Sequence, residues 1–173
     1  MTDRLRLVYL TDSMADIRMI EGLGRRAAVN VVAPDVLGDR VTNFWPPRPP
    51  SVATKTLLPG GRVAFIARAT LWLLRHRRAF DAVFVLDNLS AALAATTARA
   101  LGGPPVVVQV GRPTLDYLRC QPPGPKQKLR YLIAWLLVQI NERRADAIGA
   151  VSEYCAGQCR QRNDHVRFIP WYG

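Results

Sequence analysis

Polar residues follow three short apolar runs of the sequence, at the points where Leu5–Thr11, Ala82–Leu86 and Val106–Val110 end. Hydroxyl, carboxylate and amide groups beside an arginine suit hydrogen bonding to a polyhydroxyl or phosphorylated ligand. The predicted ligand-binding residues are Thr11, Asp12, Ser13, Asp87, Asn88, Gly111 and Arg112. Asp, Ser and Asn also cap helices, so a purely structural role remains an alternative for several of these residues.

The same loops lack the glycines that a dinucleotide site needs. The segment after the first apolar run is Thr11-Asp12-Ser13-Met14-Ala15-Asp16, which is not a G-x-G-x-x-G pattern, and the chain contains no P-loop. We therefore expect no NAD, FAD or methyl-donor cofactor in this part of the protein.

Few residues favour a metal site or nucleophilic catalysis. Cys155 and Cys159 lie four residues apart with His165 nearby, but a structural metal site normally needs four ligands. We predict buried, apolar cysteines and no metal. His76 lies among arginines at the end of a predicted helix, and no Ser/His/Asp or Cys/His set is apparent, so the sequence assigns no catalytic residue.

The elements that must position these loops alternate regularly. Apolar runs of about five to seven residues alternate with segments of helical length, which predicts a Rossmann-like, doubly wound, mainly parallel sheet of about seven strands with helices on both faces. Right-handed crossovers favour the strand order 3-2-1-4-5-6-7, with the first and fourth strands at the switch point. The predicted strands are Leu5–Thr11, Val29–Ala33, Val52–Leu58, Ala82–Leu86, Val106–Val110, Ala147–Val151 and Val166–Ile169.

Two predicted helices, Arg62–Arg78 and Lys126–Ala145, combine basic with aromatic and aliphatic residues. Such a helix can lie on an anionic bilayer, and it can equally pack between the sheet and a neighbouring domain. The residues predicted for this membrane or interdomain surface are Arg68, Trp72, Arg75, Lys126, Lys128, Arg130 and Trp135.

The composition sets broad limits. The chain has 173 residues and a net charge of +11, which predicts attraction to anionic partners. Three cysteines without a disulfide framework fit a reducing compartment. The longest apolar run, Tyr131–Val138, is too short to span a bilayer, and the N-terminus resembles no signal peptide. We expect a cytoplasmic protein, with peripheral attachment to the membrane as an alternative.

Several segments together resemble the N-terminal domain of a GT-B glycosyltransferase, most closely glycosyltransferase family 4. Phe80–Asp87 resembles the fourth strand of that family and its exit, and Glu142–Glu153 resembles its conserved Ala-Asp to Val-Ser segment. Val166–Pro170 resembles the strand that leads to its interdomain linker. The glycine-rich loop common after the first strand is replaced here by Thr11–Asp16.

This resemblance implies a division of labour between two domains. Residues 1–169 would form the acceptor-side domain and residues 170–173 would start a linker to a C-terminal domain that binds the nucleotide-sugar donor. The acceptor would be a glycan, a lipid-linked sugar or a small molecule, and this chain alone would be inactive. A nucleotide-sugar epimerase of the same build is one alternative, and a non-enzymatic basic module that binds anionic membrane or, less favoured, nucleic acid is another.

Overall fold

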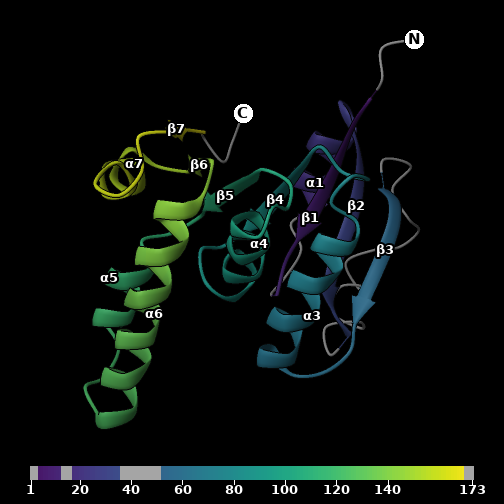
Figure 1. Cartoon of the computed structure of the whole chain (residues 1–173). Helices are drawn as coiled ribbons and strands as arrows, with labels where there is room; N and C mark the ends of the chain where they lie inside the picture. Colours follow the sequence, from purple (N-terminus) through teal and green to yellow (C-terminus); the bar gives the residue numbers. More distant parts are fainter. Residues whose placement is uncertain (1–3, 13–16, 36–51, 170–173) are drawn as a thin grey trace.

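The computed structural model describes residues 4–12, 17–35 and 52–169. Seven strands form one sheet in which every neighbouring pair is parallel, in the order β3-β2-β1-β4-β5-β6-β7 (Figure 1). The strands are β1 (Leu5–Leu10), β2 (Ala27–Pro34), β3 (Val52–Leu58), β4 (Ala82–Leu86), β5 (Val106–Val110), β6 (Ala147–Ala150) and β7 (Val166–Phe168). The predicted fold class and strand order are both confirmed.

Six helices within the described residues connect these strands. They are α1 (Ile17–Gly24), α3 (Arg62–Arg75), α4 (Ser90–Ala100), α5 (Thr114–Arg119), α6 (Pro125–Arg144) and α7 (Glu153–Arg160). Each of them except α5 occupies one of the segments of helical length that the sequence predicts, whereas the stretch between Arg112 and Pro125 is predicted to be a loop. That prediction is wrong: Thr114 and Leu118, four residues apart, are both buried and give this short helix a packed side.

Strand side chains alternate between two cores. Val8 and Leu10 belong to a large cluster that includes residues of α3, α4 and α7, whereas Tyr9 between them packs with Ile20 of α1. The helices α3, α4 and α6 lie in that sequence on the first side, since α4 contacts both of the others. Alanines dominate the buried side of α4, and their small size allows its close approach to the sheet.

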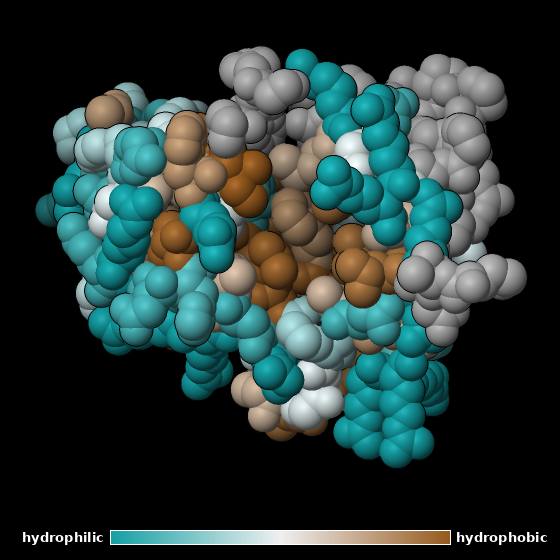
Figure 2. Space-filling view, turned by 90° about the horizontal axis from the view of Figure 1, so that it is seen from above, coloured by the Kyte–Doolittle hydropathy of each residue, from teal (hydrophilic) through white to brown (hydrophobic). Residues whose placement is uncertain are grey.

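The other side of the sheet is less evenly covered. Here α1 packs against β2 and β3, and Phe84 and Leu86 of β4 remain partly exposed. Seen from above, hydrophobic residues gather in a hollow at the centre of this face, surrounded by hydrophilic side chains (Figure 2).

The last strand–helix–strand unit forms as its sequence predicts. Ser152 precedes a segment of helical length, which predicts a helix N-cap, and its hydroxyl accepts a hydrogen bond of 3.1 Å from the Cys155 backbone N–H at the start of α7, which confirms that role. Residues 170–173, the predicted start of a linker, lie outside the described residues, as does the proline-rich segment within 36–51. Within the described part of the chain, no helix has the length and apolar character needed to cross a membrane.

Candidate functional site

The predicted polar loops meet at one edge of the sheet. Because β1 pairs with β4 and β4 pairs with β5, all in parallel, the residues that follow these strands are neighbours at their carboxyl ends. We call Thr11, Asp12, Asp87, Asn88, Gly111 and Arg112 the rim. Ser13, the remaining predicted residue, lies outside the described residues.

Two carboxylates define one part of the rim. The side chain of Asp12 is only 9% exposed, and its Oδ2 lies 3.9 Å from Nε of Arg62 at the start of α3. Asp87 has a φ of +85°, a conformation that non-glycine residues rarely adopt outside turns and functional sites. Its Oδ1 accepts a 2.6 Å hydrogen bond from the backbone N–H of Asn88, which helps to hold this turn.

Burial is the largest cause of a raised pKa for the Asp87 carboxyl, and the charge of Asp12 raises it further. The hydrogen bond from Asn88 and the positive charges of Arg112 and Arg62 act in the opposite direction. These interactions place Asp12, Asp87, Arg62 and Arg112 in one electrostatic environment. Carboxylates beside a cation can orient a polyhydroxyl ligand through directed hydrogen bonds.

Two residues of the rim, Thr11 and Asn88, are buried and bonded to the protein. Thr11 is fully buried and its N–H donates to the Val32 carbonyl. Asn88 is 2% exposed; its Nδ2 donates to Oε1 of Glu142 at 2.7 Å and its Oδ1 accepts from the Thr114 hydroxyl at 3.0 Å. Since both polar atoms of Asn88 are bonded to the protein, its placement suits positioning of the rim.

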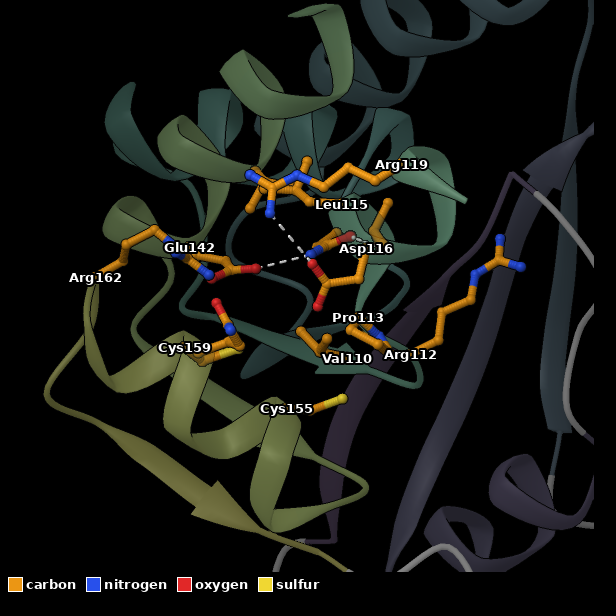
Figure 3. A pocket seen from close by; sticks show the side chains of 14 residues that line it. Val110, Arg112, Pro113, Leu115, Asp116, Arg119, Glu142, Cys155, Cys159 and Arg162 are labelled. Carbon is orange, nitrogen blue, oxygen red and sulfur yellow. Dashed lines mark hydrogen bonds and ion pairs between the residues drawn. The ribbon is translucent and has the colours of Figure 1, made fainter. Parts of the chain in front are cut away.

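A hollow of about 80 Å³ lies beside the rim, between the end of β5 and the helices α5, α6 and α7. Figure 3 shows Glu142 and Arg162 on one side of it, while the Arg112 side chain points away from it. The guanidinium of Arg112 lies 4.9 Å from the ring centroid of Tyr117, a cation–π contact on the exposed surface of α5. Arg112 therefore stands at the border between the carboxylates and the hollow.

Charged groups within the hollow are mostly paired. Asp116 lies 3.6 Å from Arg119, and its Oδ2 accepts a 2.6 Å hydrogen bond from the Tyr154 hydroxyl, which raises the pKa of that tyrosine. Glu142, with a side chain 2% exposed, accepts a 2.7 Å hydrogen bond from Nε of Arg162. Burial, and then the charge of Glu142, raises the pKa of the neighbouring Cys159 thiol to about 12, so this thiol stays protonated and unreactive.

The sequence analysis did not identify Glu142 as part of the site. The run Glu142-Arg143-Arg144 predicts a charged helix end, yet the Glu142 side chain is buried at the inner side of α6. Ala134 and Val138, eight and four residues earlier, are also buried, so helical spacing was the available signal. Cys155 and Cys159 are buried, as predicted. Among the described residues, no group of three or more His, Cys, Asp or Glu side chains could hold a metal ion.

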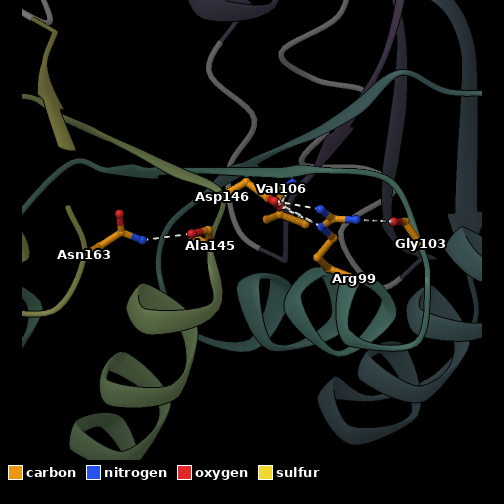
Figure 4. A network of polar contacts seen from close by, with 6 residues as sticks. All are labelled: Arg99, Gly103, Val106, Ala145, Asp146 and Asn163. Atoms are coloured by element: carbon orange, nitrogen blue, oxygen red, sulfur yellow. Dashed lines mark hydrogen bonds and ion pairs between the residues drawn. The ribbon is translucent and has the colours of Figure 1, made fainter. Parts of the chain in front are cut away.

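Asp146, four residues after Glu142, stabilises the opposite edge of the sheet. It accepts hydrogen bonds from the Arg99 guanidinium at 2.9 Å and from the Val106 backbone N–H at 2.8 Å (Figure 4). Asn163 donates to the Ala145 carbonyl at 2.8 Å in the same region. These contacts connect α4 to the amino ends of β5 and β6, which places them away from the rim.

The two basic helices differ in how they use their aromatic residues. On α3, Trp72 is partly buried, stacks on His76 with ring centroids 4.4 Å apart and packs against Phe80. Arg68 donates to the Pro59 carbonyl, and Arg75 is exposed. On α6, the predicted surface residues are all exposed, namely Lys126, Lys128, Arg130 and Trp135.

A parallel sheet of this order, with a polar rim at its switch point, defines a Rossmann-like domain of the type found in GT-B proteins. The chain belongs to the glycosyl transferase 4-like domain family, whose model matches residues 10–171. The predicted family relationship is thereby confirmed.

Solved structures with the same fold include sugar-nucleotide epimerases and a glycosyltransferase. The UDP-GlcNAc 2-epimerase from Methanocaldococcus jannaschii is 10% identical, with a TM-score of 0.61 over 95% of this chain and 45% of that one. A putative UDP-N-acetylglucosamine 2-epimerase from Listeria monocytogenes is 13% identical, with a TM-score of 0.63 over 96% and 44%. A structure described as the glycotransferase of kitacinnamycin is 14% identical, with a TM-score of 0.50 over 97% and 51%.

This chain thus spans about half the length of those proteins. At these identities the likeness establishes the fold. No curated protein matches the sequence.

Proposed function

We propose that this chain is the acceptor-binding half of a glycosyltransferase that moves a sugar from a nucleotide-sugar donor to a glycan, lipid-linked or small-molecule acceptor. The observation that carries the proposal is the rim, where Asp12, Asp87 and Arg112 meet at the switch point of the sheet. Membership of the glycosyl transferase 4-like family supports the reaction class.

In this proposal the chain's own residues orient the acceptor. Asp87 and Asp12 accept hydrogen bonds from acceptor hydroxyls, and Arg112 offsets the charge of a phosphorylated acceptor. The nucleotide-sugar would bind in a second domain, and the two domains together would form the complete cleft. Residues 1–173 alone would then transfer no sugar.

The epimerases among the similar structures raise an alternative that this half of the fold does not favour. If this chain were half of an epimerase, we would expect a carboxylate and a histidine to be paired at the rim. The two histidines of the sequence lie elsewhere: His76 follows α3 and stacks on Trp72, and His165 immediately precedes β7. Both positions are at the amino ends of strands.

Saturation-transfer NMR with glycosides, sugar phosphates and lipid-linked sugar phosphates tests the proposal. We expect saturable binding of one of these acceptor classes. Arg112→Ala should weaken the affinity for that acceptor by about tenfold or more, because the variant loses one charge-assisted hydrogen bond. Arg160→Ala, an exposed arginine of α7, is the matched control and should bind normally. Binding of nucleotide-sugars with no binding of any acceptor class would contradict the proposal.

A further inference from the structure

Helix α6 has apolar residues on two opposite sides. Ala134 and Val138 face the protein and are buried. Half a turn away, hydrophobic side chains between 36% and 58% exposed recur at spacings of three and four residues, which places them along one line of the helix surface. We call this set the apolar stripe; it consists of Leu129, Leu132, Ile133, Leu136 and Ile140.

The charges on α6 that reach solvent are all positive. Its basic residues are Lys126, Lys128, Arg130, Arg143 and Arg144, and all of them are exposed. The one acidic residue of the helix, Glu142, points inward and is neutralised by Arg162. Basic side chains therefore stand at both ends of the apolar stripe with no exposed acid between them.

We propose that α6 docks on an anionic phospholipid surface, with the apolar stripe toward the acyl chains and the flanking lysines and arginines against the phosphates. Binding of a helix to an anionic bilayer strengthens with the apolar area that it buries and with the attraction of its basic residues to anionic lipids, and α6 offers both. Trp135, 41% exposed on the same helix, suits that interface because its ring is apolar and its N–H is polar. Figure 1 shows that the lower part of α6 extends away from the sheet beside α5, where a flat surface can reach it.

Charge also decides against two other occupants of the stripe. A second copy of α6, packed in either direction, would bring positive helix ends together, and like charges across an interface are unfavourable. Nucleic acid would satisfy the basic residues but would leave the leucines and isoleucines in water. An anionic bilayer satisfies both sets of residues.

The other basic helix lacks such a stripe. On α3, Phe65 and Leu73 are buried and Trp72 packs against the core. The large apolar residues that remain exposed, Val63 and Leu71, lie two turns apart on one side of α3, and only Ala67 stands between them, so the helix has no continuous row of large apolar side chains. We therefore place the docking surface on α6 alone, and α3 serves as the control helix.

Co-sedimentation with vesicles tests the inference. We expect the protein to bind phosphatidylcholine vesicles that contain phosphatidylglycerol at least tenfold more strongly than vesicles of phosphatidylcholine alone. Leu132→Ser combined with Leu136→Ser should reduce binding to the anionic vesicles at least tenfold. Val63→Ser combined with Leu71→Ser on α3 should leave it unchanged. All four side chains are exposed, so the substitutions spare the core.

Tryptophan fluorescence gives a second readout. Anionic vesicles should shift the emission to shorter wavelength, and Trp135→Phe should remove most of that shift. Three results would overturn the inference: no binding to anionic vesicles, binding that survives the α6 substitutions, or a dimer in sedimentation velocity that the α6 substitutions dissociate. The inference does not rest on the proposed function, because vesicle binding and acceptor binding are measured separately and use different residues.

Discussion

Asp87 is the rim residue whose local environment is most unusual. It adopts a positive φ, is held by the Asn88 N–H, and lies near a second carboxylate at Asp12. Asparagine tolerates the same backbone conformation and can accept the same hydrogen bond, but it carries no charge. Asp87→Asn thus separates the charge of this residue from its geometry.

We predict that Asp87→Asn stabilises the protein at neutral pH. Burial and Asp12 raise the pKa of Asp87 in the folded state, so the folded protein retains this proton to higher pH than the unfolded chain. Wild-type stability is then lost as the pH rises from the unfolded pKa of about 3.9 through the folded value. Urea unfolding at several pH values should show a gain for the variant at neutral pH that disappears at low pH. An equal gain at all pH values would contradict the electrostatic explanation.

The buried pair of Glu142 and Arg162 should matter more for stability than any exposed pair. Arg162→Ala would leave the Glu142 carboxylate without its cation, and removal of one partner of a buried pair costs about 3–5 kcal/mol. Urea unfolding measures this loss. Arg160→Ala is the matched control on the adjacent turn, because its pair with Glu153 is exposed and should contribute less than about 1 kcal/mol. Similar losses for the two variants would contradict the assignment.

At the scale of single elements, α7 depends on its N-cap. Ser152→Ala removes the acceptor for the Cys155 N–H and should lower the free energy of unfolding by about 1 kcal/mol. Ser152→Asp restores an acceptor and should come close to wild type. A Ser152→Asp protein as unstable as Ser152→Ala would show that the hydroxyl has another role.

Strands were predictable because parallel strands buried on both sides appear in sequence as short, continuous apolar runs. The predicted bounds of β3, β4 and β5 agree with the structure. Helix ends were less predictable. Helix α3 ends at Arg75 instead of Arg78, because the run Arg75-His76-Arg77-Arg78 contains no glycine or proline that would mark the end of the helix. The six-residue α5 offered too little periodicity to distinguish it from a loop.

The candidate site was predictable only in part, for a physical reason. The strand order predicts which loops lie together, because the carboxyl ends of neighbouring parallel strands meet at one edge of the sheet. The partners of each side chain do not follow from strand order. Asn88 bonds to Glu142, which is 54 positions away, and that contact depends on the rotation of α6 about its axis. Local sequence patterns carry no information about that rotation.

At the scale of the whole molecule, the net charge of +11 implies self-repulsion in the folded state. Raising the NaCl concentration from about 0.01 M to about 0.15 M shortens the screening length from about 30 Å to about 8 Å. We expect the thermal midpoint to rise by about 2–4 °C, the shift that 1 kcal/mol produces in a domain of this size. Circular dichroism at both salt concentrations measures it, and a lower midpoint at high salt would show that ion pairs outweigh repulsion.

Three hydrogen bonds connect the turn after β4 to the helix α6. Asn141 of α6 donates to the carbonyls of residues 88 and 89, and Asn88 donates back to Glu142 on the same helix. Any surface that fixes the angle of α6 therefore also fixes the direction in which the rim opens. Docked through the apolar stripe, the domain would hold its rim at a fixed orientation to the bilayer.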